Sequence, residues 1–286
     1  MPRVSKGVLF VVATPIGNLE DITLRALRIL KQVELVAAED TRRTAILLRH
    51  YNIETSFVSV HEHNEHARIE LITGRLAKGE SVALVTDAGT PGISDPGANL
   101  VAAVRKAGFT IEPIPGASAV AAAVSVAGTT SHGFTFLGFP PIRSKDRKQW
   151  FDQLVHASIE RLVVFFEAPH RVGKTLAELG VYVKRPIILG REITKLHEEF
   201  VEGTPEELSA RFAESHGEFT VVVPPADRSK EVIEPVSDDE VVVLFGQITK
   251  RGGFGSKRDV AREVGDRLNL TAKQVYEIIE RNKLVN

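Results

Sequence analysis

The residues that could do chemistry in this sequence lie in loops that follow strand-forming runs. The loop TDAGTPGISDPG, residues 86–97, follows the apolar run Val82–Thr86. Its glycines let a ligand approach the main chain, and its prolines keep the loop rigid. Because open α/β sheets bind ligands beyond the carboxyl ends of their strands, this loop is predicted to be a binding site, with Asp87 accepting hydrogen bonds from a ribose or an amino group. Asp95 is interpreted as a helix N-cap, followed by Pro96 at the first helical position.

Two further loops have the same character. ATPIGNLED, residues 13–21, follows the first apolar run, and PIPGASA, residues 113–119, follows the run Phe109–Ile114. Neither contains the G-x-G-x-x-G pattern of a dinucleotide fold, which argues against a nicotinamide or flavin dehydrogenase. Three such loops after three strands of one sheet favour a shared binding site over three separate turns.

The stretch EAPHRVGKT, residues 167–175, ends like a phosphate-binding P-loop. However, Ala168 stands where the first glycine of that motif belongs, and Pro169 lacks a backbone donor, so a nucleotide triphosphatase is disfavoured. The same stretch places a carboxylate, an imidazole and a guanidinium at one strand end: Glu167, His170 and Arg171.

Two other polar clusters have open interpretations. REITKLHEE, residues 191–199, is either a solvated edge hairpin or a place where Arg191 and Lys195 meet an anionic substrate. HEHNEH, residues 61–66, lacks the H-E-x-x-H spacing of zinc enzymes, and the chain has no cysteine, so we interpret it as a polar loop and predict no metal site.

Short apolar runs alternate with helical patterns through most of the chain, which indicates α/β architecture. The first half predicts a parallel-rich sheet, and the second half, where late strands are closely spaced, predicts a mixed sheet. The strands are expected at 8–13, 33–38, 57–60, 82–86, 109–114, 134–137, 162–166, 186–189, 198–202 and 218–223. Helices are expected at about 23–32, 65–78, 95–108, 146–157, 171–181 and 205–215. A further helix is expected to begin at about residue 41, and another to follow PGASA.

The composition shift near the C-terminus predicts a separate module. We expect an N-terminal α/β domain at 1–118, a second α/β domain at 119–226, a proline-containing charged linker at 227–240 and a small basic helical module at 241–286. Ser256 with Asp259, and Thr271 with Gln274, are expected to cap two short helices of this module.

The whole-chain composition is that of a soluble globular protein. The 286 residues carry a formal net charge of -1, so any site for a polyanion must be local. The absence of cysteine excludes a thiol nucleophile and suits the cytoplasm, which is the expected location. The N-terminal apolar run is ended by Pro15 and Gly17 well short of a membrane span, so no membrane association is expected.

Eight stretches in this order resemble the 16S ribosomal RNA cytidine 2′-O-methyltransferases of the tetrapyrrole methylase superfamily. They are VATPIGNLEDIT, AAEDTRRT, HEHNE, TDAGTPGISDPG, PGASA, FLGFPP, FFEAPHR and GREITKLHEE, within residues 7–223. The resemblance implies a two-domain tetrapyrrole-methylase-like fold, a homodimer, and S-adenosylmethionine bound in the cleft between the domains. It further implies methylation of the ribose 2′-hydroxyl of a cytidine in the decoding region of 16S rRNA in the small ribosomal subunit.

The resemblance also assigns site residues. It implies that the cofactor binds Asp87, Ala88, Gly89, Pro91, Gly116, Ala117, Ser118, Leu137 and Gly138. It places Pro15, Gly17 and Asn18 on the side of the cleft that faces substrate.

Transfer of a methyl group to a ribose hydroxyl calls for a residue that accepts the hydroxyl proton. Glu167, Lys195, His170 and Glu198 are candidates, and Glu167 and Lys195 are favoured because each flanks a predicted strand end; a lysine could act only if its pKa were lowered. The phosphates of the RNA are expected to contact the basic helical module at 241–286 and four arginines: Arg42, Arg43, Arg171 and Arg191. Surface salt bridges are an equally good explanation for any one of these arginines.

Three other functions stay open. The chain could methylate a tetrapyrrole or other small molecule, or a modified protein histidine, or it could be a ribosome-assembly factor that holds cofactor without catalysis.

Overall fold

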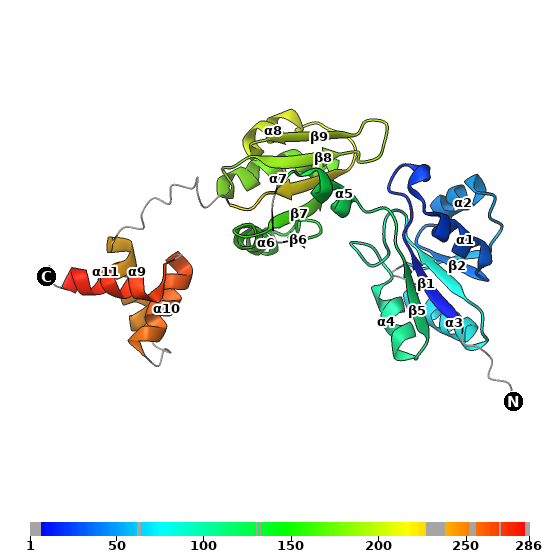
Figure 1. Ribbon diagram of the computed structural model, residues 1–286, viewed down its shortest axis with the longest axis horizontal. Helices are drawn as coiled ribbons and strands as arrows, with labels where there is room; N and C mark the ends of the chain where they lie inside the picture. Colours follow the sequence, from blue (N-terminus) through cyan, green and yellow to red (C-terminus); the bar gives the residue numbers. More distant parts are fainter. Residues whose placement is uncertain are drawn as a thin grey trace. The chain divides into compact units, whose positions relative to one another are not determined.

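The computed structural model describes residues 7–61, 64–129, 131, 133–226, 238–251, 256–268 and 270–283. The chain divides into two compact units, Met1–Ala226 and Asp227–Asn286, which are described separately. In the described residues, the first unit contains two five-stranded sheets with helices, and the second contains three helices (Figure 1). None of the helices in the described residues is long and apolar enough to cross a membrane. The predicted α/β fold class is confirmed.

The first sheet is parallel throughout, with the strand order β3-β2-β4-β1-β5. Its strands are β1 (Val8–Val12), β2 (Leu35–Ala38), β3 (Phe57–Ser59), β4 (Val82–Val85) and β5 (Thr110–Ile114). Every residue of β2 and β4 is buried, as expected for parallel strands covered on both faces. Because β1 lies between β4 and β5, the three glycine-containing loops leave the sheet side by side.

Helices cover both faces of this sheet (Figure 1). They are α1 (Leu24–Gln32), α2 (Thr41–His50), α3 (Glu65–Ala77) and α4 (Ala98–Lys106), with a short 3-10 turn η1 (Leu19–Asp21) before α1. The apolar side chains of α1 and α2 pack on one face, and those of α3 and α4 pack on the other.

The predicted start of α4 is wrong. The helix begins at Ala98, its N-cap is Gly97, and no side chain caps it, so Asp95 is not the N-cap. Gly97 has φ +113°, a left-handed conformation that only glycine adopts without strain, and a Cβ there would lie 3.0 Å from a methyl carbon of Leu84. The chain therefore enters the helix only after Gly97, and Asp95 stays in the loop.

The second sheet is mixed, with the strand order β6-β7-β10-β8-β9. Its strands are β6 (Phe134–Phe136), β7 (Leu162–Glu167), β8 (Ile187–Arg191), β9 (Glu199–Gly203) and β10 (Phe219–Val223). Only the β6–β7 pair is parallel; the other pairs are antiparallel. The parallel-rich and mixed sheets expected from the sequence are both present.

Different helices cover the two faces of the second sheet. On one face lie α6 (Ser144–Ala157), α7 (Pro169–Tyr182) and α8 (Pro205–Arg211), and on the other lies α5 (Ala119–Val126). The two neighbouring phenylalanines of β7 divide between these faces: Phe165 packs under α6–α8 and Phe166 packs with α5. Helix α7 begins two residues before the predicted position, with Pro169 in its first turn. Helix α8 begins with a capping box formed by Thr204 and Glu207.

The described part of the second unit, within residues 238–283, forms a bundle of three helices. Its helices are α9 (Asp238–Arg251), α10 (Lys257–Leu268) and α11 (Ala272–Lys283), whose apolar side chains form one core. The expected capping contacts are present, since the Oγ of Ser256 is 2.7 Å from Asp259 and Gln274 accepts from the backbone N–H of Thr271 at 2.8 Å. Helix α9 was not predicted, and it includes the last three residues of the predicted linker; residues 227–237 of that linker lie outside the described residues.

Candidate functional site

The three glycine-containing loops meet beyond the carboxyl ends of β1, β4 and β5. Thr14 and Gly89 form a two-hydrogen-bond bridge between two of the loops, with N–H to O distances of 2.8 and 3.1 Å. The Thr14 hydroxyl also donates to the carbonyl of Thr86 at 3.1 Å. The N–H of Ala13 donates to the carbonyl of Ile114 at the end of β5, so the loop after β5 is joined to the same edge of the sheet. The sequence-based expectation that these loops lie together is therefore confirmed.

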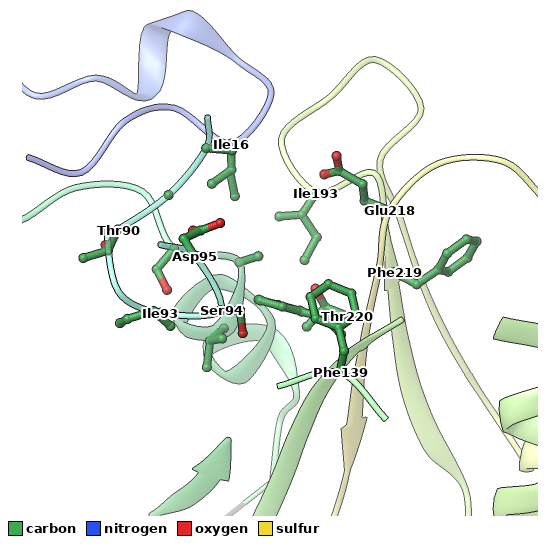
Figure 2. Close-up of a pocket in the computed structure, with 16 residues that line it drawn as sticks. Ile16, Thr90, Ile93, Ser94, Asp95, Phe139, Ile193, Glu218, Phe219 and Thr220 are labelled. Atoms are coloured by element: carbon green, nitrogen blue, oxygen red, sulfur yellow. The ribbon is translucent and has the colours of Figure 1, made fainter. Parts of the chain in front are cut away.

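A cavity of about 220 Å³ lies between this edge and the second sheet (Figure 2). One wall is the loop 88–95, and the opposite wall comes from the second sheet and from α5. The lining residues on this side include Phe166 and Thr220 of the second sheet and Phe139 from the segment after β6. Figure 2 shows Ile16 and Ile193 on opposite sides of the cavity, while the side chain of Phe219 points away from it. The cavity thus has an apolar and aromatic wall on one side and a wall of small and polar loop residues on the other.

Two glycines with positive φ lie next to residues that line the cavity. Gly89 has φ +76°, and a Cβ on it would lie 3.6 Å from a methyl carbon of Ile16. Gly138 has φ +63°, and a Cβ on it would lie 3.6 Å from the hydroxyl of Ser94. Since Ile16 and Ser94 both line the cavity, a larger side chain at either glycine would extend toward a lining residue. Both positions are also strained for residues other than glycine.

The predicted cofactor residues divide between this cavity and its surroundings. Ala88, Gly89 and Ser118 line the cavity directly. Gly116 and Ala117 line an adjoining hollow of about 560 Å³ that shares Ser118, Ile16 and Ile193 with the cavity. Leu137 packs into the core of the second sheet, and its carbonyl accepts from the indole N–H of Trp150 at 3.2 Å.

Asp87 and Pro91 do not line the cavity. Asp87 lines a separate hollow with Pro15, and its carboxylate accepts from the backbone N–H of Asp40 at 3.0 Å and lies 3.5 Å from Arg43. Pro91 is buried and lines a hollow between α4 and β5. These two residues therefore support the loop, while their neighbours Ala88 and Gly89 reach the cavity.

The loop between β8 and β9 crosses to the first sheet and contacts the loop after β1. The aliphatic chain of Lys195 packs on Gly17, where a Cβ would lie 2.5 Å from the Cγ of the lysine. The hydroxyl of Thr194 donates to the carboxylate of Asp21. The structure thus brings together Gly17, predicted to face substrate, and Lys195, predicted as a catalytic residue. Asn18, in the same β1 loop, accepts from the backbone N–H of Glu20 at 3.1 Å and begins η1.

Lys195 is held as a cation. Burial by itself lowers the pKa of the ammonium, but the hydrogen bonds and negative charges of Glu192 and Glu218 outweigh burial and raise it above its ordinary value. The ammonium lies 2.8 Å from Glu192 and 3.1 Å from Glu218. A lysine could remove a proton only with a lowered pKa, so this environment argues against Lys195 as the base.

Glu167 is enclosed on the face of β7 opposite the cavity. Its carboxylate, which has no exposed surface, accepts from the N–H of Ala168 at 2.8 Å and from the hydroxyl of Thr175 at 2.5 Å, and lies 3.3 Å from Arg171. Side chains alternate faces along a strand, so Glu167 shares the face of Phe165 while Phe166 reaches the cavity.

The network around Glu167 holds the segment that carries Phe139. Arg171 donates to the carbonyl of Pro140, and Arg147 donates to that of Pro141 at 3.2 Å. Arg147 also donates to Thr175 at 2.8 Å, which closes the network. Through two arginines, Glu167 therefore fixes the chain next to the cavity wall.

The remaining predicted residues lie outside the cavity. His170 and Glu198 are exposed, and Glu198 lines the adjoining hollow. Arg42 and Arg43 are exposed, with side chains 89% and 63% accessible. Arg191 is partly enclosed, donating to the carbonyl of His216 and to Glu199 at 2.9 Å each. Of the four arginines, Arg42 and Arg43 are thus the ones most accessible to a polyanion.

The sequence-based reasoning missed Asp95 as a cavity residue. Asp95 is half-buried, lines the cavity and points toward it in Figure 2. Burial, together with the negative charges of Glu39 and Asp87, raises the pKa of its carboxyl to about 6. Burial and the charge of Asp87 also raise the pKa of Glu39, against the hydrogen bond from the Asp87 N–H. Gly97 was the signal that could have corrected the assignment, because a left-handed glycine separates Asp95 from the helix.

Backbone strain is concentrated here. Among the described residues, the non-glycine residues with positive φ are Asn52, Ser94, Glu192 and Thr194. Ser94 lines the cavity, Thr194 lines the adjoining hollow, and Glu192 binds Lys195. Strained conformations persist where the surrounding structure enforces them, and they are common at ligand sites.

The described residues include no group of three or more His, Asp or Glu side chains placed to hold a metal ion. In the stretch HEHNEH, His63 lies outside the described residues, whereas the side chain of Asn64 accepts from the backbone N–H of His61 at 2.9 Å.

Residues 8–209 match the family described as Tetrapyrrole (Corrin/Porphyrin) Methylases. The chain therefore belongs to the tetrapyrrole methylase family. It is 49% identical over 229 residues to the ribosomal RNA small subunit methyltransferase I of Neisseria meningitidis serogroup B, covering 78% of each chain. It is 39% identical over 279 residues to the protein of the same name from Synechocystis, covering 95% of this chain and 97% of the relative.

Solved structures confirm the fold. A uroporphyrin-III-C-methyltransferase from Thermus thermophilus aligns over 85% of this chain and 99% of its own, with a TM-score of 0.54 at 21% identity. A diphthine synthase aligns over 76% of this chain and 89% of its own, with a TM-score of 0.59 at 16% identity. At such identities the similarity concerns the fold alone.

Proposed function

We propose that this protein transfers a methyl group from S-adenosylmethionine to the ribose 2′-hydroxyl of a cytidine in the decoding region of 16S rRNA. Family membership and the names of relatives that match nearly the whole chain support methyl transfer to small-subunit rRNA. The observation that carries the proposal is the cavity in which the small loop residues Ala88 and Gly89 face the aromatic wall of Phe139 and Phe166.

The residues of the cavity fit a nucleoside-containing methyl donor. A side chain at Gly89 or Gly138 would fill space that the structure keeps open, and the aromatic wall offers flat apolar surfaces to a ring. Ala88, Gly89, Ser118 and Gly138 are the residues that would hold the donor, with Gly116 and Ala117 in the adjoining hollow. When bound, the donor supplies an electrophilic methyl group on a sulfonium.

The protein's own contribution is then to align the ribose hydroxyl, exclude water and accept a proton. Lys195 and Gly17, whose chain neighbours Thr194 and Ile16 line the adjoining hollow, are the candidates for contacting the RNA backbone near the cavity. The catalytic roles predicted for Glu167, Lys195 and His170 stay predictions.

The RNA is proposed to contact exposed basic side chains. Arg42 and Arg43 at the start of α2 are accessible. Arg42 lies next to Asp40, and Arg43 lies next to Asp87. In the second unit, Lys257, Arg258 and Lys273 are also exposed. Phosphate contacts of this kind weaken with salt, so salt dependence of binding measures their number.

The homodimer and the cytoplasmic location belong to the same proposal. Val126, 56% exposed at the end of α5, and Phe134, 46% exposed in β6, are apolar surface that a second copy could cover. Sedimentation of the purified protein tests the dimer: a single monomeric species at micromolar concentration would contradict it.

Methyl transfer to purified small ribosomal subunits tests the function. We expect label from S-adenosylmethionine to appear in 16S rRNA as one 2′-O-methylcytidine, identified by mass spectrometry of the digested RNA. Transfer to a tetrapyrrole but not to the subunit would favour the small-molecule alternative. Donor binding with no transfer to any of these acceptors would favour a non-catalytic assembly factor.

A further inference from the structure

Asp95 is a carboxylate of the cavity wall with no structural task in the helix that follows it. Helix α4 begins at Ala98 behind Gly97, and the N-terminal N–H of Leu100 is instead bound by Glu65 at 3.1 Å. Within the described part of the chain, no hydrogen bond or ion pair engages the Asp95 carboxylate. Its side chain lies at the cavity, next to Ser94, whose backbone is strained.

The charged groups around Asp95 come from every neighbouring element. Glu39 follows β2, and Asp87 follows β4, where Arg43 offsets part of its charge at 3.5 Å. His61 and Glu65 line the hollow on the outer side of Asp95, and Glu65 is committed to α4 through Asn99 and Leu100. Glu218 lines the far wall of the cavity and is paired with Lys195.

These surroundings set the proton affinity of Asp95. Partial burial, followed by the negative charges of Glu39 and Asp87, brings its pKa to about 6, so the carboxyl is mostly ionised near neutral pH yet is a stronger base than an ordinary aspartate. A general base works best when its pKa lies near the working pH. The other candidates are less suited: Glu167 is enclosed away from the cavity, and Lys195 is held protonated.

We propose that Asp95 is the general base that accepts the proton of the ribose 2′-hydroxyl. This inference rests on the proposed function. The 2′-oxygen forms its bond to the methyl carbon as the bond between that carbon and the donor sulfur breaks, with the electron pair leaving on sulfur. The hydroxyl proton passes to a carboxylate oxygen of Asp95 and then to water, which restores the carboxylate.

The variant Asp95→Asn tests the proposal, because it keeps the size of the side chain and removes the base. Single-turnover transfer to small ribosomal subunits is expected to slow by ~10²–10⁴-fold. The affinity for S-adenosylhomocysteine, measured by calorimetry, is expected to stay within about threefold of wild type. The wild-type rate should rise with pH through an apparent pKa near 6 and then level off, and the variant should lose this rise.

A measurement without donor or RNA checks the same residue. Carboxyl-carbon NMR of the free protein should show one aspartate titrating near pH 6, and this signal should be absent from Asp95→Asn. As a matched control, Glu39→Gln removes a negative neighbour, so the rise in rate should move to lower pH while the plateau rate stays within about threefold.

Two results would overturn the proposal. A large loss of S-adenosylhomocysteine affinity in Asp95→Asn would make Asp95 an anchor for the donor, and an unchanged transfer rate would show that another group takes the proton. In both cases wild-type transfer to the subunit would still support the proposed function. If wild-type protein neither binds donor nor methylates the subunit, the proposed function itself fails.

Discussion

Replacing Glu167 with Gln should loosen the cavity wall while leaving the chemistry intact. The substitution keeps the volume of the side chain but removes the charge that faces Arg171 at 3.3 Å and accepts from Thr175 at 2.5 Å. A hydrogen bond to a charged group contributes about 1.5–3 kcal/mol, and glutamine keeps part of the network, so we expect the free energy of unfolding to fall by about 2 kcal/mol. Glu167→Ala, which leaves Arg171 without its buried partner, should lower it by about 3–5 kcal/mol.

The only tryptophan of the chain reports on this region. Trp150 is 6% exposed, packs in the same core as Phe165 and donates to the carbonyl of Leu137. Its fluorescence during urea unfolding therefore gives the midpoint for the domain that contains Glu167. Glu178→Gln is the matched control: it removes a carboxylate that bonds Arg147 at 2.5 Å but is 34% exposed, and it should lower the free energy of unfolding by less than about 1 kcal/mol.

The effect on function separates positioning from catalysis. Because the two arginines hold the carbonyls of Pro140 and Pro141 beside Phe139, Glu167→Gln should weaken donor binding several-fold and leave the pH profile of transfer unchanged. A ~10²–10⁴-fold slower transfer with unaltered stability and donor affinity would refute this reasoning and establish Glu167 as the base.

Three further predictions follow from single positions. Gly89→Val should abolish detectable donor binding, because the side chain would enter the cavity at a left-handed φ of +76°; calorimetry that finds wild-type affinity would contradict it. Asp95→Asn should stabilise the protein by about 1 kcal/mol at pH 7.5, after allowance for its partial exposure. In the wild type the pKa of Asp95 is about 6 in the folded state, above the ordinary 3.8, so the folded state is fully stable below pH 3.8 and loses stability as pH rises through 6. The difference in melting temperature between Asp95→Asn and the wild type should therefore shrink toward pH 4. Gly265→Ala should unfold the three-helix unit, since its Cβ would lie 2.4 Å from the carbonyl oxygen of Leu270; hydrogen exchange should lose protection in 238–283 alone.

Much of the first sheet follows from the sequence, because buried parallel strands are continuous apolar runs between helical patterns. The runs at β2 and β4 are buried at every residue. The meeting of the three loops also follows, since they leave neighbouring strands at one edge. The helix start at Asp95 was wrong because Asp-Pro has the form of an N-cap, whereas the conformation of Gly97 decides where the helix begins.

The second wall of the cavity could not be predicted from local pattern. The run Leu162–Glu167 is apolar almost throughout, so it does not reveal which of Phe165 and Phe166 faces the cavity. A shift of one residue exchanges the two faces of a strand, which is why Glu167 was expected at the cleft and lies on the opposite face. Helix α9 was missed because its first turn, Asp238–Glu240, is acidic, so it was assigned to the charged linker that precedes it.

The central claim is that the cavity between the loop 88–95 and the second sheet binds an activated methyl donor. Titration calorimetry of the intact protein with S-adenosylmethionine and with S-adenosylhomocysteine tests this claim most directly. The account predicts saturable binding of each ligand with one site in unit 1 of each chain. No heat with either ligand, whether small ribosomal subunits are present or absent, would contradict it.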